Sequence, residues 1–422
     1  MLEKFTFGQQ IKYVRTIKKI NQNELAKGIC SISYLSKIEN GVIYPSEEIK
    51  NLLIKKLGIE DSTLNNEFGE REIQGFYNFL LNKDIQNAEK VYKELLNKDF
   101  SEALNLRFEV ISIFYFVERK QFKELPHLIQ SIFSKEAQLP SELRYFFYKA
   151  LGYYYYHTQK AEKSLYFFEK SVSLVTMFTL NNLEIADLYY AYSLAAARLK
   201  KTAICLKYCQ SALEIYQELY LLKRCVDCHV LLGITHRRNN NMEEAISQYK
   251  TALDLAGQIY YKDIYLTIQH NLGFLYGVIG EIDKAIDLFQ EILSKEDQLT
   301  PYVHVQTILS LVKELHKRNN NKEAFQLVQK GFELLIKHPD LKNQFYLEFN
   351  FYNLLLLDKY EELQKLLFSK VIPALEMEKK YFSLSNYCLF LGDHHYANGK
   401  YKNAAKYFAY SREFLNKSNL TK

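Results

Sequence analysis

Hydrogen-bonding side chains gather in a short stretch near the beginning of the chain, between residues 21 and 41. They are Gln22, Ser31, Ser33, Tyr34 and Lys37. Hydroxyl, amide and ammonium groups at helical spacing are the groups with which proteins contact phosphates and read base edges. We expect the last four residues to reach the major groove of duplex DNA. We expect the first, Gln22, to bond a phosphate from the N-terminus of the preceding helix.

Two short helices have to position these groups. Leu25, Ala26 and Ile29 recur at helical spacing in the first, and Leu35 and Ile38 lie on one side of the second. A break separates the two helices, and the outward face of the second helix is small and polar. Two helices joined by a tight turn are typical of a helix-turn-helix, whose second helix enters the major groove. The alternative is a small helical domain that binds only protein.

A second set of polar and aromatic residues recurs through the body of the chain. They are Asp187, Tyr190, Asp227, Arg237, His270, Asn271, Phe274, Gln306 and Lys313. Side-chain amides can replace the backbone partners of an extended peptide, while charged and aromatic residues select its sequence. We therefore expect these residues to line a peptide-binding groove, with Asn271 as the principal peptide contact. The alternative for each is a solvated groove residue that contacts no ligand.

A sequence repeat with a period near forty residues places this second set. In its clearest copies a glycine is followed by a small residue, an aromatic residue and another small residue, as in Gly233, Ala245, Tyr249 and Ala252. Nine copies can be aligned on Phe76, Ile113, Gly152, Ser193, Gly233, Gly273, Val312, Phe351 and Gly392. This pattern resembles the tetratricopeptide repeat, in which small residues let paired helices approach closely. We expect a right-handed superhelix whose concave face is lined by the first helix of each pair.

The cysteines suggest two alternatives, and neither is favoured. Cys225, Cys228 and His229 match a haem-attachment pattern but fall within an expected helix. Cys205 and Cys209, on the preceding helix, could join Cys225 and Cys228 in a zinc site, although buried packing cysteines are commoner. We therefore expect no metal and no cofactor. We also find no catalytic constellation, so we expect no enzyme activity.

Composition and charge agree with a DNA-binding head on a nearly neutral body. Of the net charge of +6 in 422 residues, residues 1–59 carry +5, from ten basic and five acidic side chains. A basic head suits contact with phosphates. No apolar run is long enough for a membrane span, and residues 1–10 lack a signal-peptide core, so we expect a cytoplasmic protein.

The expected fold class is all-α, with a helix-turn-helix domain followed by about nine repeats. We expect the DNA-binding domain in residues 1–60, a linker in residues 61–70 and the peptide-binding array in residues 71–422. Asn-rich segments at 236–241 and 316–321 lie two periods apart, and we interpret them as turns between paired helices.

The head resembles the lambda-repressor and Cro-like class. The matching positions are Gly8, Arg15, Gln22, Leu25, Ala26, Ser33, Ile38, Glu39, Gly41, Pro45, Leu53 and Leu57. In that class the residues matching Arg15 and Glu39 form a structural ion pair. The turn is one residue shorter than in the phage repressors. A head with this shortened turn, followed by the repeats, resembles the peptide-sensing quorum regulators of Gram-positive bacteria (Rap, NprR, PlcR and PrgX type), and NprR most closely.

The resemblance implies a transcriptional regulator that binds a re-imported secreted peptide and dimerises on operator DNA. It also implies an alternative, an interaction protein that sequesters a response regulator of the sporulation phosphorelay. Rap proteins have a three-helix bundle in place of this head, so the chemistry of Rap phosphatases does not transfer to residues of this chain.

Overall fold

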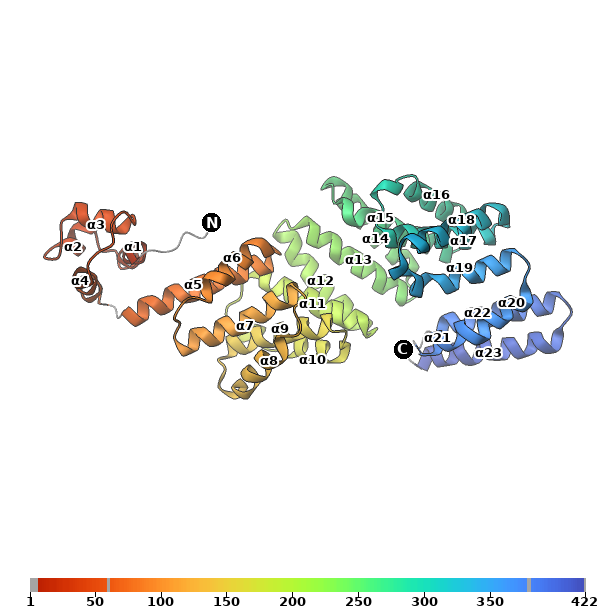
Figure 1. The fold of residues 1–422 in the computed structure, drawn as a ribbon, viewed down its shortest axis with the longest axis horizontal. Coiled ribbons are helices and arrows are strands. Elements are labelled where there is room, and N and C mark those ends of the chain that lie inside the picture. The colour runs from red at the N-terminus through yellow and green to blue at the C-terminus, as the bar shows by residue number, and fades with distance from the viewer. Residues whose placement is uncertain (1–6, 59–60, 378–380, 421–422) are drawn as a thin grey trace. The chain divides into compact units, whose positions relative to one another are not determined.

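A computed structural model describes residues 7–58, 61–377 and 381–420. The secondary structure of these residues is helical, which confirms the all-α prediction. The chain divides into two compact units, Met1–Leu199 and Lys200–Lys422 (Figure 1). Among the described helices, none is both long enough and apolar enough to cross a membrane.

The first unit begins with a small four-helix head. Its helices are α1 (Phe7–Ile17), α2 (Gln22–Ala26), α3 (Ile32–Glu39) and α4 (Glu47–Leu57). Polar side chains cap three of the four N-termini: Asn21, Ser31 and Ser46 each accept a hydrogen bond from a backbone N–H of the first turn. Such caps satisfy N–H groups that have no partner within the helix. The local sequence therefore determines where these helices begin.

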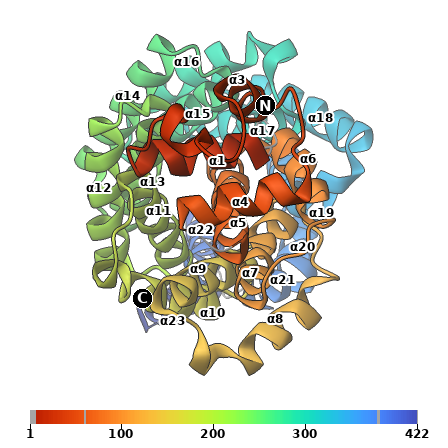
Figure 2. The ribbon, with the colours of Figure 1, turned by 90° about the vertical axis from the view of Figure 1, so that its left-hand side faces the viewer.

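The core of the head joins α1 to the helix-turn-helix. Ile11, Leu25 and Leu35 are fully buried in it. Helix α3 packs against α1 (Figure 2). The two backbones are so close that a Cβ atom on Gly8 would lie 1.6 Å from the carbonyl oxygen of Ile38. Only a residue without a side chain fits at position 8, so Gly8 sets the position of α3.

Residues 61–70, predicted as a linker, are helical and form the first half of α5 (Asp61–Leu81). The stretch is polar but contains no proline, so nothing in it prevents a helix. Phe68 lies in the core of the head, where its ring meets the Tyr13 ring at a centroid distance of 5.9 Å. The guanidinium carbon of Arg71 lies 3.8 Å from the centre of the Tyr13 ring. The boundary predicted at residue 60 lies outside the described residues.

The remaining helices of the first unit continue the repeat pattern. They are α6 (Ile85–Leu95), α7 (Glu102–Glu118), α8 (Leu125–Ser134), α9 (Ser141–His157), α10 (Ala161–Val172) and α11 (Asn182–Arg198). Short 3₁₀ turns follow two of them, η1 (Glu136–Gln138) and η2 (Val175–Met177).

The second unit consists of the later repeats. Its helices are α12 (Thr202–Glu218), α13 (Leu222–Arg238), α14 (Met242–Gln258), α15 (Lys262–Val278), α16 (Ile282–Leu293), α17 (Pro301–Lys317), α18 (Asn321–Lys337), α19 (Lys342–Leu356), α20 (Tyr360–Leu366), α21 (Ile372–Met377), α22 (Tyr381–Ala397) and α23 (Tyr401–Leu420). Between them lie the 3₁₀ turns η3 (Glu296–Gln298) and η4 (Pro339–Leu341) and a π-helical segment, η5 (Leu367–Val371). Pro373, just after η5, lacks the N–H that a regular α-helical ladder needs.

All nine repeat anchors fall in the first helix of a pair, here called the A helix. The A helices are α5, α7, α9, α11, α13, α15, α17, α19 and α22. The turns after them contain residues with positive φ, among them Asn240 (58°) and Asn319 (62°). The interpretation of the two Asn-rich segments as turns is therefore confirmed.

The spacing between the glycine and the aromatic residue of each repeat is explained by how the two helices pack. A Cβ on Gly273 would lie 2.8 Å from Cε1 of Phe289, so the ring of the second helix lies directly over the glycine of its own A helix. Phe289 also shares a core cluster with Ile308 of the next repeat. One aromatic side chain thus closes a helix pair and joins it to the next pair.

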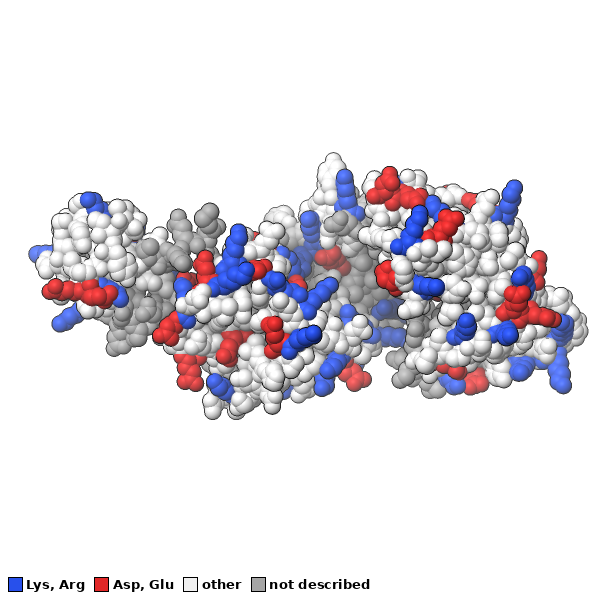
Figure 3. All heavy atoms as spheres, viewed as in Figure 1, with Lys and Arg blue, Asp and Glu red and all other residues white. Residues whose placement is uncertain are grey.

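Basic and acidic side chains are interspersed over both units on the face shown in Figure 3. This agrees with the nearly neutral charge of the sequence beyond residue 59.

Candidate functional site

The exposed face of α3 is the first candidate site. Leu35, Ile38 and Glu39 are buried on the inner side of this helix. On the outer side Ser33 and Lys37 are exposed, as predicted for groove residues. At 100° per residue, Ser36 and the C-cap residue Asn40 lie near Ser33 and Lys37 on this outer side. Ile32 lies nearer the buried side of the helix wheel but is nevertheless exposed at the first position of α3. None of these three residues was predicted. Helical periodicity in the sequence could have identified Ser36 and Asn40, but it could not have identified Ile32.

Two of the predicted groove residues have roles within the head. The hydroxyl oxygen of Ser31 accepts a hydrogen bond from the backbone N–H of Tyr34 at 3.1 Å and caps α3. The Tyr34 side chain is half-buried and packs against the core of the head. Both side chains thus have a structural role in the head: Ser31 caps the helix, and the Tyr34 ring packs against the core.

Gln22 also makes a contact within the head. Glu39, 1% exposed, accepts hydrogen bonds from Arg15 Nε at 2.6 Å and Arg15 Nη2 at 3.0 Å. Gln22 Nε2 donates to the same carboxylate at 2.6 Å. The hydrogen bond with Glu39 raises the pKa of Arg15, although burial opposes this shift. The predicted ion pair is therefore confirmed, and one amide proton of Gln22 binds this buried carboxylate.

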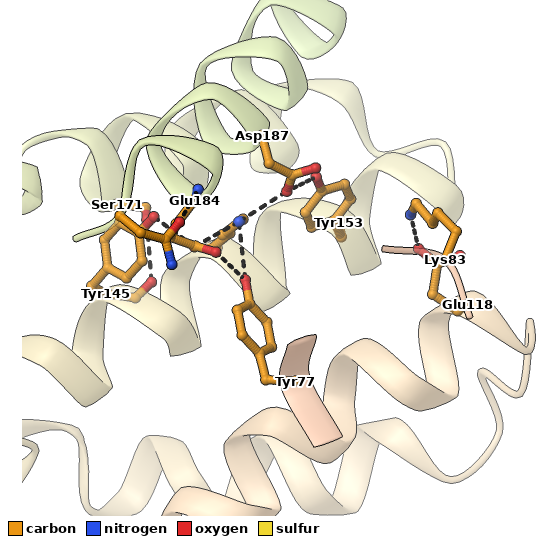
Figure 4. A network of polar contacts seen from close by, with 10 residues as sticks. Tyr77, Lys83, Glu118, Tyr145, Tyr153, Ser171, Glu184 and Asp187 are labelled. Atoms are coloured by element: carbon orange, nitrogen blue, oxygen red, sulfur yellow. Dashed lines mark hydrogen bonds and ion pairs between the residues drawn. The ribbon is translucent and has the colours of Figure 1, made fainter. Parts of the chain in front are cut away.

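The A helices are the second candidate site, and all predicted peptide-binding residues lie on them. In the first unit Asp187 belongs to a buried polar cluster (Figure 4). Its Oδ2 lies 2.9 Å from Lys149 Nζ and accepts a hydrogen bond from the Tyr153 hydroxyl at 2.8 Å. Asp187 is 6% exposed. Its carboxylate thus stabilises a buried lysine, a role that differs from the predicted groove position. Tyr190, one turn further along α11, is half-buried.

Lys149 is the centre of this cluster, and sequence analysis did not identify it. Its Nζ donates to Glu184 Oε1 at 2.6 Å and to the Tyr77 hydroxyl at 3.0 Å. The Tyr77 and Tyr145 hydroxyls each donate to Glu184 at 2.8 Å. Burial by itself disfavours the charged amine, but the attraction of Asp187 and Glu184 leaves the pKa of Lys149 raised. The lysine is therefore charged and joins α5, α9 and α11.

In the second unit the structure brings several predicted residues together. The Arg237 guanidinium of α13 lies 5.1 Å from the centre of the Phe274 ring of α15, and Phe274 is 38% exposed. Asn271 and Gln306 are half-buried on α15 and α17. Lys313 Nζ lies 2.5 Å from Oε2 of Glu348 on the next A helix, α19. These A helices therefore share a partly exposed surface of cationic, amide, aromatic and acidic groups.

Two other predicted groove residues lie deeper than the sequence suggested. His270 is 3% exposed, and its Nε2 lies 3.1 Å from the Ser310 hydroxyl. Burial lowers the pKa of His270 to about 4, so its ring is neutral at pH 7. Asp227 is half-buried, and burial raises the pKa of its carboxyl group to about 6 although Arg224 opposes the shift. His270 thus belongs to the interior, while Asp227 lies at its edge.

The cysteines of α12 and α13 are buried as free thiols. The Cys205 sulfur lies 3.2 Å from the Thr235 hydroxyl, and the Cys209 thiol donates to the Cys228 carbonyl oxygen at 3.5 Å. Within the described part of the chain, no three His, Cys, Asp or Glu side chains are grouped so that they could hold a metal ion.

Comparisons with known proteins agree with this architecture. A helix-turn-helix profile matches residues 11–64, and a tetratricopeptide-repeat profile matches residues 228–294. The chain therefore combines a helix-turn-helix head with tetratricopeptide-like repeats.

The transcriptional activator NprA of Geobacillus stearothermophilus is 32% identical to this chain over 404 residues, which are 93% of this chain and 98% of NprA. The chain belongs to the family of NprA, and the predicted resemblance to this group of regulators is confirmed. This relative is named as a transcriptional activator and not as an enzyme.

Solved structures show the same fold. The apo form of the quorum sensor NprR from B. thuringiensis has a TM-score of 0.69 at 17% identity, and the match covers 83% of this chain and 99% of that chain. NprR in complex with its cognate peptide NprX has a TM-score of 0.55 at 18% identity, with 82% and 98% covered.

Proposed function

We propose that this protein is a cytoplasmic transcriptional regulator whose binding to operator DNA is controlled by a short signalling peptide held on its A helices. The observation that carries the proposal is the outward polar face of α3, held by a core in which Gly8 and the Arg15–Glu39 pair determine the position of the helix. This arrangement presents Ser33 and Lys37 for contact with base edges. The name of NprA as a transcriptional activator supports the same function.

The peptide site that we propose lies in the second unit, on α13, α15 and α17. An extended peptide needs partners for its backbone amides, and the half-buried amides of Asn271 and Gln306 can supply them. The Arg237–Phe274 contact and the Lys313–Glu348 pair offer charged and aromatic contacts for its side chains. The neighbouring fold of NprR, solved with its cognate peptide NprX, supports this class of ligand.

The two sites would be coupled through the repeats. A peptide that contacts several A helices favours one curvature of the array over another, and only such differential binding shifts an equilibrium. The heads of a two-fold dimer would then fit adjacent half-sites only in one peptide state. By linkage, operator DNA must change peptide affinity by the factor with which peptide changes DNA affinity.

The test begins with isolation of the ligand. Full-length protein is used to capture peptides from the medium of its own dense culture, and mass spectrometry identifies them. Calorimetry with the synthetic peptide then compares wild type with Asn271→Ala, with Asn353→Ala as a control whose amide side chain donates no peptide contact in this proposal. Asn271→Ala should weaken peptide binding at least tenfold, and equal affinity would refute the proposed site.

The DNA half of the proposal has its own measurement. Genomic fragments bound by the full-length protein are identified with and without the captured peptide, and affinity is measured by fluorescence anisotropy. Lys37→Ala should weaken binding and change base preference. If peptide binds but DNA affinity is the same in its presence and absence, gating fails. Capture of a response regulator from the host would then favour the sequestration alternative.

A further inference from the structure

Ile32 presents an apolar side chain to solvent at the beginning of α3. It is the first residue of the helix and is 47% exposed, whereas the nearby apolar residues Leu35 and Ile38 are 0% and 1% exposed. Its two sequence neighbours, Ser31 and Ser33, are exposed and polar. Ile32 therefore contributes little to the core of the head, and its side chain is available to a partner.

We propose that Ile32 is a specificity-determining residue that contacts the 5-methyl group of a thymine in the major groove. This inference rests on the proposed DNA-binding function and extends it. In a helix-turn-helix the N-terminal residues of the second helix are those that contact base edges. Ile32 occupies that end of α3, so docking of the head would bring its side chain against the floor of the groove.

The chemistry of the groove selects the partner. An isoleucine side chain has no donor or acceptor, so it cannot read the amino, carbonyl or ring-nitrogen groups of the bases. If it covered one of these groups, it would remove water without replacing the hydrogen bond, which costs free energy. The thymine methyl is the apolar group that base pairs present in the major groove. Ile32 should therefore favour an A·T pair in one orientation.

The side chains next to Ile32 have other roles in the head. The hydroxyl oxygen of Ser31 caps α3, and the Tyr34 ring packs on the core of the head. At 100° per residue, Ser33 lies about 100° and Lys37 about 140° round the helix from Ile32. Both are exposed and carry hydrogen-bonding groups, so they suit the polar edges of adjacent base pairs. The exposed residues of α3 thus combine one apolar side chain with polar side chains.

Deoxyuridine provides the sharpest test because it differs from thymidine only by this methyl group. Duplexes are first enriched from a random library by the full-length protein, together with the peptide-sized fraction of its own dense culture. Each thymine of the enriched site is then replaced by deoxyuridine, one position in each half-site. For the wild-type protein, one position should lose affinity about fourfold per methyl group, equivalent to about 0.8 kcal/mol.

Three protein variants are then compared on the same thymine and deoxyuridine duplexes. Ile32→Ala should bind thymine and deoxyuridine duplexes equally at that position, whereas Ile32→Val should keep part of the difference. Ile17→Ala is the matched control, because Ile17 is a 59% exposed isoleucine on α1, and it should keep the full wild-type difference. Thermal unfolding verifies that each variant is folded.

The outcomes distinguish the inference from the function on which it rests. If the wild type enriches a site but no thymine in it is sensitive to loss of the methyl group, Ile32 does not read a thymine. The same conclusion follows if the sensitive position remains equally sensitive in Ile32→Ala. If the wild type enriches no sequence at all, the proposed DNA-binding function is refuted, and the inference with it.

Discussion

Replacement of Lys149 by methionine tests whether the buried cluster in the first unit is held by charge. The Lys149 side chain is 0% exposed, and its Nζ lies 2.6 Å from Glu184 and 2.9 Å from Asp187. Methionine keeps the length of the side chain but leaves two carboxylates buried without their cation. Removal of one partner from a buried ion pair costs about 3–5 kcal/mol. We expect a local loss of stability of this size in α9 and α11.

Amide hydrogen exchange read by mass spectrometry is the suitable assay, because a chain with two units need not unfold in one step. At about 1.4 kcal/mol per tenfold change, protection of α9 and α11 should fall by roughly 10²- to 4 × 10³-fold. Helices α17 and α18 of the second unit should keep their protection. The loss should be smaller at lower pH, because protonation neutralises a carboxyl group that the variant leaves buried.

Two further variants decide the cause. Lys163→Met removes an exposed lysine from α10 and should leave protection within about threefold of wild type, since exposed charges contribute little. The triple variant Lys149→Met, Glu184→Gln, Asp187→Asn removes every charge of the cluster and should recover most of the protection. If Lys149→Met alone leaves the exchange of α9 and α11 unchanged, the reasoning is refuted.

Three further predictions follow from local geometry. Gly8→Ala places a methyl group 1.6 Å from the Ile38 carbonyl oxygen, so the head should lose its fold and DNA binding while the second unit keeps its protection. Gly273→Ala forces the Phe289 ring to move and should destabilise the second unit by about 1–3 kcal/mol in urea unfolding. Burial lowers the pKa of His270 to about 4, below the ordinary value of 6.5 for histidine, so the ring is neutral in the folded protein. Its contribution to the free energy of unfolding is complete above pH 6.5 and is lost as the pH falls towards 4. The difference between the two pKa values corresponds to about 3 kcal/mol, and His270→Gln should flatten the pH dependence of unfolding in this range.

Local features of the sequence were sufficient to predict the helices and the repeat. Capping residues such as Ser31 and Ser46 mark helix starts, because each satisfies N–H groups of the next few residues. Gly273 and Phe289 lie sixteen residues apart and meet in the structure, because a helical hairpin has a fixed length. The sequence predicts which residues are buried wherever the packing partner lies in the same or the next helix.

The sequence predicted the candidate site only in part, because the exposure of a side chain depends on residues that are distant in the sequence. Ser33 and Lys37 are exposed, as helical periodicity required. The Gln22 amide donates a hydrogen bond to Glu39, which lies seventeen residues later. The Asp187 carboxylate pairs with Lys149, which lies on α9. No spacing rule connects such pairs. Their contacts arise from the packing of separate helices.

The sequence by itself determined the helix-turn-helix, the period of the repeats and the placement of polar residues on A helices. These follow from helical periodicity, capping and close packing at small residues, which act over a few residues or one hairpin. The tertiary structure alone decided that Asp187 and His270 are buried and that Ile32 is exposed. The reason is physical: the free energy of a polar or apolar group depends on whether neighbouring helices exclude water from it.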